Sequence, residues 1–288
     1  MSQDIPGEDI YIWPDVPKPD EVNVALVWKH EFGSLVPYKG LRGICSFGAG
    51  VDSILADPLL PKVPVARIVD PDLASNMSQF VVTQIQHHKL RMDRFERQQK
   101  QSLWLPKSPK RTNRVGILGL GQLGEATARL LVQFGFKVMG WSRTHKSLDC
   151  VQSFSGKNGF DEMIPQCDYL VCLLPLTNET DSILDRRVFE ALPNHAVVIN
   201  VARGEHLVDE DLLWALDNEQ LDFAYLDVFR REPLEPTHPF WAHSKVRLTP
   251  HVSAVTNIET ATIQIVENYK RVQSGLAMMN VVDLAKGY

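Results

Sequence analysis

The chain has 288 residues and a formal net charge of −5 at pH 7, with 44% hydrophobic and 23% charged residues. This composition is that of an ordinary folded enzyme and excludes disordered and collagen-like proteins. The acidic balance offers no cationic surface for a phosphate backbone, so we expect no nucleic-acid partner. No window approaches the roughly 18 apolar residues of a membrane helix. The N-terminus lacks the basic and apolar regions of a signal peptide, so we expect no membrane partner and no export.

Short β-rich runs alternate with Pro and Gly in the first part of the chain, from Asp9 to about Arg67. They predict strands at 10–13, 24–28, 43–47 and 65–68. Residues 73–104 then lack Gly and Pro and carry apolar side chains at helical spacing, which predicts one or two helices. The run 106–113, with two prolines and three cations, is the predicted linker.

After the linker, strand, turn and helix patterns alternate. Apolar strands are predicted at 114–118, 136–141, 169–174, 196–201, 223–226 and 246–248, and helices at 123–134, 186–192, 208–216 and 255–273. This alternation is typical of a doubly wound parallel sheet. We therefore predict an α/β protein of two domains, each with a parallel sheet flanked by helices, the larger a Rossmann dinucleotide-binding fold.

The four cysteines form neither a Cys-x-x-Cys pair nor a Cys/His cluster with zinc spacing. We therefore interpret Cys45, Cys150, Cys167 and Cys172 as reduced, mostly packed thiols, and we expect no metal site. Reduced thiols favour a cytoplasmic location.

Gly119, Gly121 and Gly124 follow the predicted strand 114–118 and open a helix. This spacing is the dinucleotide fingerprint, in which the glycines allow a tight turn, close backbone approach to the pyrophosphate, and close helix packing. Gln122 and Leu123 lie at the helix N-terminus, where phosphates bind. A methyl-donor site and a plain glycine-rich turn are the alternatives, and the flanking strands favour a dinucleotide over both.

The end of the next strand indicates which dinucleotide binds. An NAD site places Asp or Glu there for the ribose 2′-hydroxyl, but this chain has Ser142, Arg143, Thr144 and Lys146. The planar fork of the arginine, the two hydroxyls and the lysine charge suit a 2′-phosphate. We therefore predict NADP(H) in preference to NAD(H). The alternative is that Arg143 and Lys146 are solvated turn cations.

Several separate motifs, in the right order, resemble the D-isomer-specific 2-hydroxyacid dehydrogenase family, and most closely its glyoxylate/hydroxypyruvate reductase A branch. Besides the fingerprint they are the segments 47–55, 141–143, 174–177, 200–204, 226–234, 249–251 and 282–288. The resemblance implies NADPH-dependent reduction of a small 2-keto acid, glyoxylate or hydroxypyruvate, to glycolate or D-glycerate, with domain closure excluding water. It also implies a homodimer formed through the cofactor domain.

The resemblance also implies the domain limits. A substrate-binding domain would span residues 1–103, an NADP-binding Rossmann domain 104–256, and a C-terminal helix and tail 257–288 would return to the first domain. The chain begins near the family's second strand, so we expect an opening strand and helix to be missing from the first domain.

By resemblance, Arg203, Glu232 and His251 form the catalytic trio. A guanidinium binds a carboxylate bidentately and polarises the neighbouring carbonyl, so Arg203 suits the substrate anchor. An imidazolium can donate the proton in reduction, so His251 suits the general acid. A carboxylate beside the ring fixes its tautomer, which suits Glu232. Glu235 is the rival, and only the family pattern selects Glu232.

The resemblance implies further binding residues. Backbone N–H groups of Ala49 and Gly50 would hold the substrate carboxylate, and Trp28 and Trp241 would wall its pocket. Asp227 would bind the nicotinamide carboxamide. The remaining residues of the cofactor groove would be Leu174, Pro175, Thr180, Val201 and Ala202.

Two alternatives stay open at this point. One is a dehydrogenase of a larger 2-hydroxy acid such as phosphoglycerate, against which the missing regulatory extension and the pair Ser142 and Arg143 count. The other is a non-catalytic, nicotinamide-sensing binding module like the corepressors that share this fold. Such a module would bind the cofactor tightly and turn over no keto acid.

Overall fold

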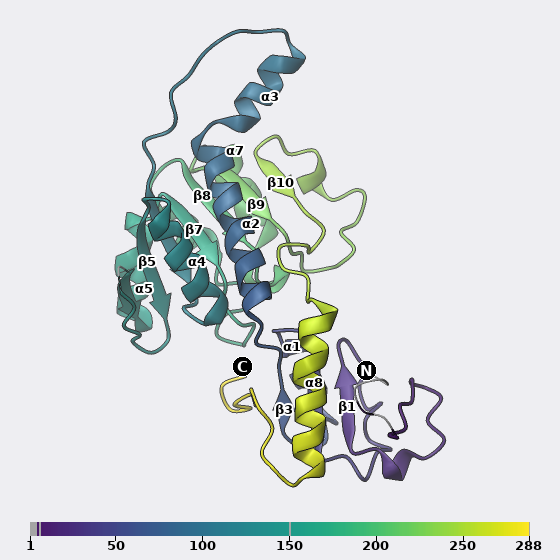
Figure 1. Cartoon of the computed structure of the whole chain (residues 1–288). Coiled ribbons are helices and arrows are strands. Elements are labelled where there is room, and N and C mark those ends of the chain that lie inside the picture. Colours follow the sequence, from purple (N-terminus) through teal and green to yellow (C-terminus); the bar gives the residue numbers. More distant parts are fainter. Residues whose placement is uncertain (1–4, 6, 150, 288) are drawn as a thin grey trace. The chain divides into compact units, whose positions relative to one another are not determined.

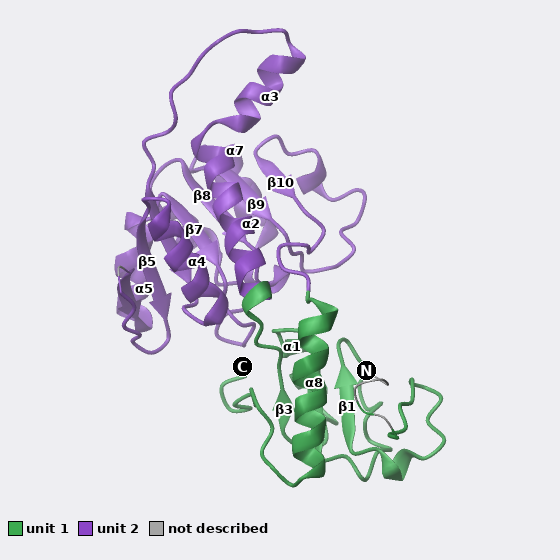
Figure 2. Ribbon diagram, viewed as in Figure 1, with its two compact units in different colours: residues 1–72, 256–288 green, residues 73–255 purple. Residues whose placement is uncertain are grey.

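The structure is a computed structural model that describes residues 5, 7–149 and 151–287 (Figure 1). The chain divides into two compact units, coloured separately in Figure 2: residues 1–72 with 256–288 form unit 1, and residues 73–255 form unit 2. The expected limit after residue 103 differs from this division. Helix α2 (Pro71–Lys89) accounts for the difference, because its apolar face packs on strands of unit 2.

Unit 1 contains a three-stranded parallel sheet in the order β1-β2-β3. Its strands are β1 (Val24–Val27), β2 (Gly43–Ser46) and β3 (Val65–Ala66), and its helices are α1 (Asp52–Leu55) and α8 (Ile258–Gln273). Helix α8 begins after Asn257, whose side-chain oxygen accepts the N–H of Glu259 at 2.9 Å. Ala261 and Ile265 of α8 belong to one apolar cluster with Cys45 of β2. The C-terminal helix thus completes the unit that the first strands begin.

Unit 2 contains a seven-stranded parallel sheet in the order β10-β9-β8-β7-β4-β5-β6. Its strands are β4 (Arg114–Leu118), β5 (Lys137–Ser142), β6 (Val151–Ser155), β7 (Tyr169–Cys172), β8 (Ala196–Asn200), β9 (Leu221–Leu226) and β10 (Val246–Leu248). The remaining helices are α3 (Met92–Lys100), α4 (Gln122–Gln133), α5 (Gly156–Met163), α6 (Arg186–Ala191) and α7 (Asp209–Asp217). The strand order changes direction between β4 and β7, the switch point where doubly wound sheets bind ligands. The predicted two-domain α/β fold is confirmed.

Helices cover both faces of the large sheet. Helices α2 and α4 pack on one face through residues such as Val81 and Leu131, and α5, α6 and α7 pack on the other through residues such as Phe189 and Leu212. Because both faces are covered, the central strand β7 is buried at every position. In Figure 1, helix α3 and the segment that follows it project from the rest of unit 2.

The structure differs from the sequence prediction at several elements. No strand forms at 10–13, where an isolated bridge pairs Ile12 with Asp15 and Pro14 has no N–H to extend it. The sequence prediction also lacks α1, β6 and α5. Strand β6 lies at the sheet edge and buries only Phe154, so its sequence shows no continuous apolar run.

Two further expectations concern the state of the cysteines and membrane-spanning helices. Cys45, Cys167 and Cys172 are free and buried, and burial raises the pKa of the Cys45 and Cys167 thiols to about 12. Cys150 lies outside the described residues. Within the part of the chain that the structure describes, no helix combines the length and the apolar character needed to cross a membrane.

Candidate active site

The three residues of the predicted catalytic trio follow three neighbouring strands of unit 2. Arg203 comes after β8, Glu232 after β9 and His251 after β10, and these strands pair in parallel in that order. The carboxyl ends of parallel strands share one edge of the sheet. Residues far apart in the sequence therefore come to the same edge.

Glu232 and His251 contact each other directly. The Nδ1 atom of His251 lies 3.1 and 3.0 Å from the two carboxylate oxygens of Glu232. Because an ionised carboxylate only accepts, we assign the proton to Nδ1, which leaves Nε2 for proton transfer. The N–H of Phe229 also donates to Glu232 Oε1 at 3.1 Å and helps to fix the carboxylate. The rival Glu235 pairs instead with Arg231.

Asp227 holds the turn that carries His251. Its side chain is fully buried; it accepts the hydroxyl of Thr249 and the N–H groups of Val252 and Ser253 at 2.9 and 2.8 Å. His251 has a φ of 54°, a left-handed conformation that is uncommon for a residue other than glycine. Its N–H donates to the Asp227 carbonyl at 2.8 Å. This positioning role is one that sequence reasoning missed, and the predicted contact of Asp227 with nicotinamide stays a prediction.

Arg203 lies in a tight turn after β8. The side-chain amide of Asn200 donates to the Arg203 carbonyl at 2.8 Å. A Cβ on the next residue, Gly204, would lie 1.8 Å from the carbonyl carbon of Phe229. This close approach needs glycine. The turn of Arg203 is therefore packed against the segment that leads to Glu232.

The three fingerprint glycines have three different environments. Gly119 has a φ of +100°, and a Cβ there would lie 2.6 Å from the carbonyl oxygen of Leu173. A Cβ on Gly124 would lie 1.8 Å from the carbonyl oxygen of Gly119. Around Gly121, in contrast, no described atom beyond the glycine and its two chain neighbours lies within 4 Å of the Cβ position. The open space at the N-terminus of α4 fits a pyrophosphate, so the turn fits a dinucleotide.

The predicted 2′-phosphate residues lie in the turn after β5. Lys146 Nζ donates to the carbonyl oxygen between the first two fingerprint glycines at 2.6 Å, so this cation lies at the glycine turn. The Ser142 hydroxyl donates to the Thr144 carbonyl at 2.8 Å and closes the turn. Arg143 Nη1 lies 3.6 Å from a carboxylate oxygen of Glu179, an acid that the sequence analysis did not single out.

Thr180 fixes the loop after β7. Its hydroxyl donates to the Pro175 carbonyl at 2.7 Å and accepts the N–H of Thr177 at 2.8 Å. Nε2 of the buried His206 lies 3.3 Å from the same Pro175 carbonyl. Because β7 and β4 are paired, this loop and the glycine turn leave neighbouring strands. The other predicted cofactor residues lie in the first turn of α4 or directly after β7 and β8: Gln122, Leu123, Leu174, Val201 and Ala202.

Unit 1 carries most of the predicted substrate residues at the carboxyl ends of its own strands. Ser46 holds the loop after β2, since its hydroxyl donates to the Gly50 carbonyl at 3.1 Å and accepts the N–H of Gly48 at 3.2 Å. A Cβ on Gly48 would lie 2.0 Å from the ring of Trp28, so this ring packs on the loop. Within the described residues, the N–H groups of Ala49 and Gly50 have no acceptor.

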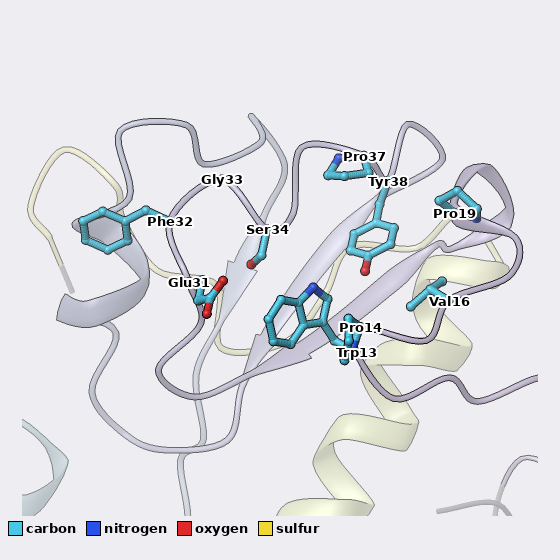
Figure 3. Close-up of a pocket in the computed structure, with 10 residues that line it drawn as sticks. All are labelled: Trp13, Pro14, Val16, Pro19, Glu31, Phe32, Gly33, Ser34, Pro37 and Tyr38. Atoms are coloured by element: carbon cyan, nitrogen blue, oxygen red, sulfur yellow. The ribbon is translucent and has the colours of Figure 1, made fainter.

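The remaining predicted substrate residue, Trp241, lies in unit 2, and unit 1 carries a surface pocket. Trp241, in unit 2, is 58% exposed and donates from Nε1 to the Glu235 carbonyl at 2.9 Å. A surface pocket of about 440 Å³ in unit 1 is lined by residues that include Trp13, Phe32 and Tyr38 (Figure 3). None of the predicted site residues lines this pocket.

One cluster in the described residues has a spacing that a metal ion could use. His87, Asp93 and Glu96 place ligand atoms within 4.8 Å of one another. Arg247, however, pairs with Asp93 and lies 3.6 Å from Glu96. The guanidinium already supplies the positive charge there, so we assign no metal to this cluster.

Comparison with known proteins identifies the family. Residues 82–253 match the model of the D-isomer specific 2-hydroxyacid dehydrogenase, NAD binding domain. The chain is 40% identical over 272 residues to a glyoxylate/hydroxypyruvate reductase A of Yersinia enterocolitica, covering 92% of this chain and 87% of that protein.

Solved structures agree with this match. A D-isomer specific 2-hydroxyacid dehydrogenase from Xanthobacter autotrophicus, in complex with NADPH and MES, superposes with a TM-score of 0.94 at 38% identity, over 100% of this chain and 93% of that chain. An NADPH-dependent glyoxylate/hydroxypyruvate reductase from Sinorhizobium meliloti, in complex with NADP and sulfate, gives a TM-score of 0.89 at 37% identity, over 93% and 87%. The resemblance drawn from the motifs is confirmed: the chain belongs to the D-isomer specific 2-hydroxyacid dehydrogenase family.

Proposed function

We propose that the chain reduces glyoxylate or hydroxypyruvate with NADPH, giving glycolate or D-glycerate. The observation that carries the proposal is the contact of His251 with Glu232 at the sheet edge where Arg203 also lies. The names of two relatives support the substrates and the cofactor. The protein from Yersinia enterocolitica is a glyoxylate/hydroxypyruvate reductase A, and the one from Sinorhizobium meliloti is an NADPH-dependent glyoxylate/hydroxypyruvate reductase.

His251 acts as the general acid in this reaction. When bound, NADPH would supply the hydride for the keto carbon. The imidazolium gives its Nε2 proton to the carbonyl oxygen, so a hydroxyl forms and the ring becomes neutral. Glu232, which accepts from Nδ1, keeps the second ring proton in place and stabilises the imidazolium before transfer.

Arg203 anchors the substrate carboxylate. A guanidinium offers paired N–H donors in a plane, which match a carboxylate and can also polarise the adjacent keto group. Asn200 and the close packing of Gly204 fix its turn before substrate arrives, which lowers the cost of orientation. In unit 1, the N–H groups of Ala49 and Gly50 would supply further donors to the carboxylate.

Arg143 and Lys146 would account for the preference for NADPH. Arg143→Ala removes the planar donor for the 2′-phosphate, and a hydrogen bond to a charged group contributes about 1.5–3 kcal/mol. We therefore expect the KM for NADPH to rise about 10- to 100-fold. NADH, which lacks the 2′-phosphate, is the matched control, and equal losses with both cofactors would contradict the role.

A turnover assay tests the function itself. Glyoxylate, hydroxypyruvate and pyruvate are each supplied with NADPH and with NADH, and oxidation of the cofactor is followed. We expect the fastest turnover with NADPH and one of the first two acids. Tight NADPH binding without turnover of any keto acid would refute the proposal and favour a sensing role.

We also propose that the chain forms a homodimer through helix α3 and the segment after it. The supporting observation is exposed apolar surface: Trp104 is 94% exposed, and Leu103 and Leu105 are 47% and 51% exposed. Large apolar side chains so exposed are typical of interfaces. Light scattering should give a dimer for the native chain and a monomer for Trp104→Ser. A native monomer would refute the proposal.

A cytoplasmic location is a further part of the proposal. Its support is that Cys45, Cys167 and Cys172 are free and buried. Cell fractionation should recover the reductase activity with cytoplasmic marker enzymes, and recovery in an exported fraction would contradict it.

A further inference from the structure

Arg67 lies directly after β3, beside the loop that the proposed function assigns to the substrate. Its N–H donates to the Asn280 carbonyl at 3.1 Å, so the backbone at this position is fixed. The next residue, Ile68, donates its N–H to the carbonyl of Gly48 at 3.0 Å. Strands β2 and β3 are parallel neighbours, so Arg67 and the loop of Ala49 leave the same edge of the small sheet.

The Arg67 side chain is half-buried and has no acceptor among the described residues. Each of the other half-buried lysines and arginines in the described ranges has at least one acceptor in the chain. Arg114, for example, pairs with Asp168 at 2.7 Å. Burial lowers the pKa of the Arg67 guanidinium, and no neighbouring acid offsets that effect.

A half-buried cation without an acceptor is costly for the fold. Desolvation of a charge destabilises a protein unless a partner compensates for it. The nitrogens of Arg67 are not among the buried side-chain atoms that lack a partner, so water still reaches them. A dissolved anion can therefore reach the guanidinium, for which the described residues provide no acceptor.

The neighbouring loop also offers hydrogen-bond donors that suit an anion. The N–H groups of Ala49 and Gly50 have no acceptor in the described part of the chain. Backbone N–H groups and a guanidinium are the usual donors to a carboxylate. Both kinds of donor follow adjacent strands, at the sheet edge where parallel sheets bind ligands.

We infer that Arg67 is an additional anion-binding residue of unit 1, which pairs with a carboxylate group of the keto-acid substrate. This inference rests on the proposed function. Arg67 contacts the substrate and transfers no proton, so its loss should act on substrate binding. It also explains why an unpaired cation is kept at this position at a cost in stability.

Kinetics of Arg67→Met test the inference at saturating NADPH. We expect the KM for glyoxylate to rise about 10- to 100-fold, because a charge-assisted contact is lost. The KM for NADPH should stay within about twofold, and Arg67→Lys, which keeps the charge but loses the planar fork, should show a smaller rise in the glyoxylate KM. Lys62→Met is the matched control, since it removes one exposed cation from the same unit and should leave both KM values unchanged.

Thermal unfolding gives a second readout that does not depend on turnover. Sodium oxalate, a non-reducible dianion, should raise the Tm of the native chain and of Lys62→Met above that in sodium chloride of equal ionic strength. The Arg67→Met chain should show no such rise. Without ligand, Arg67→Met should melt at the same temperature as the native chain or slightly higher, because an uncompensated charge is gone.

The outcomes separate the two proposals. A native chain that binds oxalate through Arg67 but reduces no keto acid refutes the proposed function alone. Unchanged glyoxylate KM and unchanged oxalate response in Arg67→Met overturn the inference alone. A lower Tm with an unchanged KM would show a structural role and would also overturn it.

Discussion

The fingerprint glycines allow one substitution to impair cofactor binding and another to impair folding. Gly121→Ala adds a methyl group where no described atom beyond the two chain neighbours lies within 4 Å, and the φ of −77° and ψ of −166° at Gly121 are open to alanine. Gly124→Ala places a methyl group 1.8 Å from the carbonyl oxygen of Gly119. The two positions are three residues apart on one turn, so each substitution controls for the other.

The expected loss of stability for Gly124→Ala follows from the overlap. Real Cβ atoms essentially never come closer than 3.0 Å to such an atom, so the start of the helix and the Gly119 carbonyl must separate by at least 3.0 − 1.8 = 1.2 Å. Overpacking of this kind costs about 1–3 kcal/mol, while replacing a helical glycine returns up to about 1 kcal/mol. The net loss of about 1–2 kcal/mol lowers the Tm by about 2–8 °C for a unit of this size.

Gly121→Ala should instead act on the ligand. Alanine is a poorer N-cap than glycine by about 0.5–1 kcal/mol, but it restricts the unfolded chain by about 0.4–1 kcal/mol. The Tm should therefore change by less than about 2 °C. The methyl group occupies the space of the pyrophosphate, and the loss of one or two backbone hydrogen bonds to a charged group raises the Kd for NADPH about 10- to 100-fold.

Melting without cofactor and titration calorimetry with NADPH measure the two effects separately. The reasoning about the open space is refuted if Gly121→Ala binds NADPH as the native chain does. The reasoning about packing is refuted if Gly124→Ala keeps the native Tm. A parallel fall of Tm in both variants would mean that the turn tolerates no methyl group at all.

Three further predictions use other parts of unit 2. His251→Gln should lower kcat about 100-fold or more, because the general acid is lost, while NADPH binding by calorimetry stays unchanged; a native kcat would exclude this acid. Glu179→Gln should lower the KM for NADPH about 1.5- to 5-fold, because an exposed ion pair with Arg143 contributes about 0.2–1 kcal/mol; the KM for NADH is the control, and an equal fall would contradict the reasoning. Burial alone would raise the pKa of Asp222, but hydrogen bonds from His88 and Lys110 outweigh it and lower that pKa. The ionised group therefore stabilises the fold above the unfolded pKa of about 3.9, and the stabilisation is lost as pH falls further through the folded value. Asp222→Asn should lower the Tm at pH 7 and differ less from the native chain at pH 3; a constant difference would refute the pairing.

Much of the fold could be predicted because parallel strands that are buried on both faces have continuous apolar sequences. Strand β8 reads Ala-Val-Val-Ile-Asn and is buried throughout. Strand β6 reads Val-Gln-Ser-Phe-Ser and buries only Phe154, so no pattern in the sequence marks it. An edge strand is held by its hydrogen bonds to β5, and those depend on the fold around it.

The site was predictable where a motif names a residue and unpredictable where a role depends on surroundings. Side-chain chemistry alone does not separate Glu232 from Glu235; the family motif selects Glu232, and in the structure it is Glu232 that contacts His251. Arg67 shows the limit most clearly. The absence of an acceptor is a property of the folded neighbourhood, so no arrangement of letters around Arg67 indicates it.

The positions of the functional loops follow from one physical constraint on buried polar groups. Ser46 ends β2, Asn200 ends β8 and Asp227 comes directly after β9, and each is at most 1% exposed. A polar group so deeply buried must be hydrogen-bonded. Each finds its partners in the backbone of the loop that follows or adjoins its strand: the Gly48–Gly50 loop, the turn of Arg203, and the turn of His251.

This constraint joins the rigid sheet to the chemistry at its edge. The register of the strands fixes where each apolar run ends, and the buried polar residue at that point fixes the backbone that comes next. The loop can then hold a left-handed histidine or unpaired N–H groups, because its anchor is part of the core. A polar residue that closes an apolar strand is thus the signal in the sequence that reports where a functional loop is held.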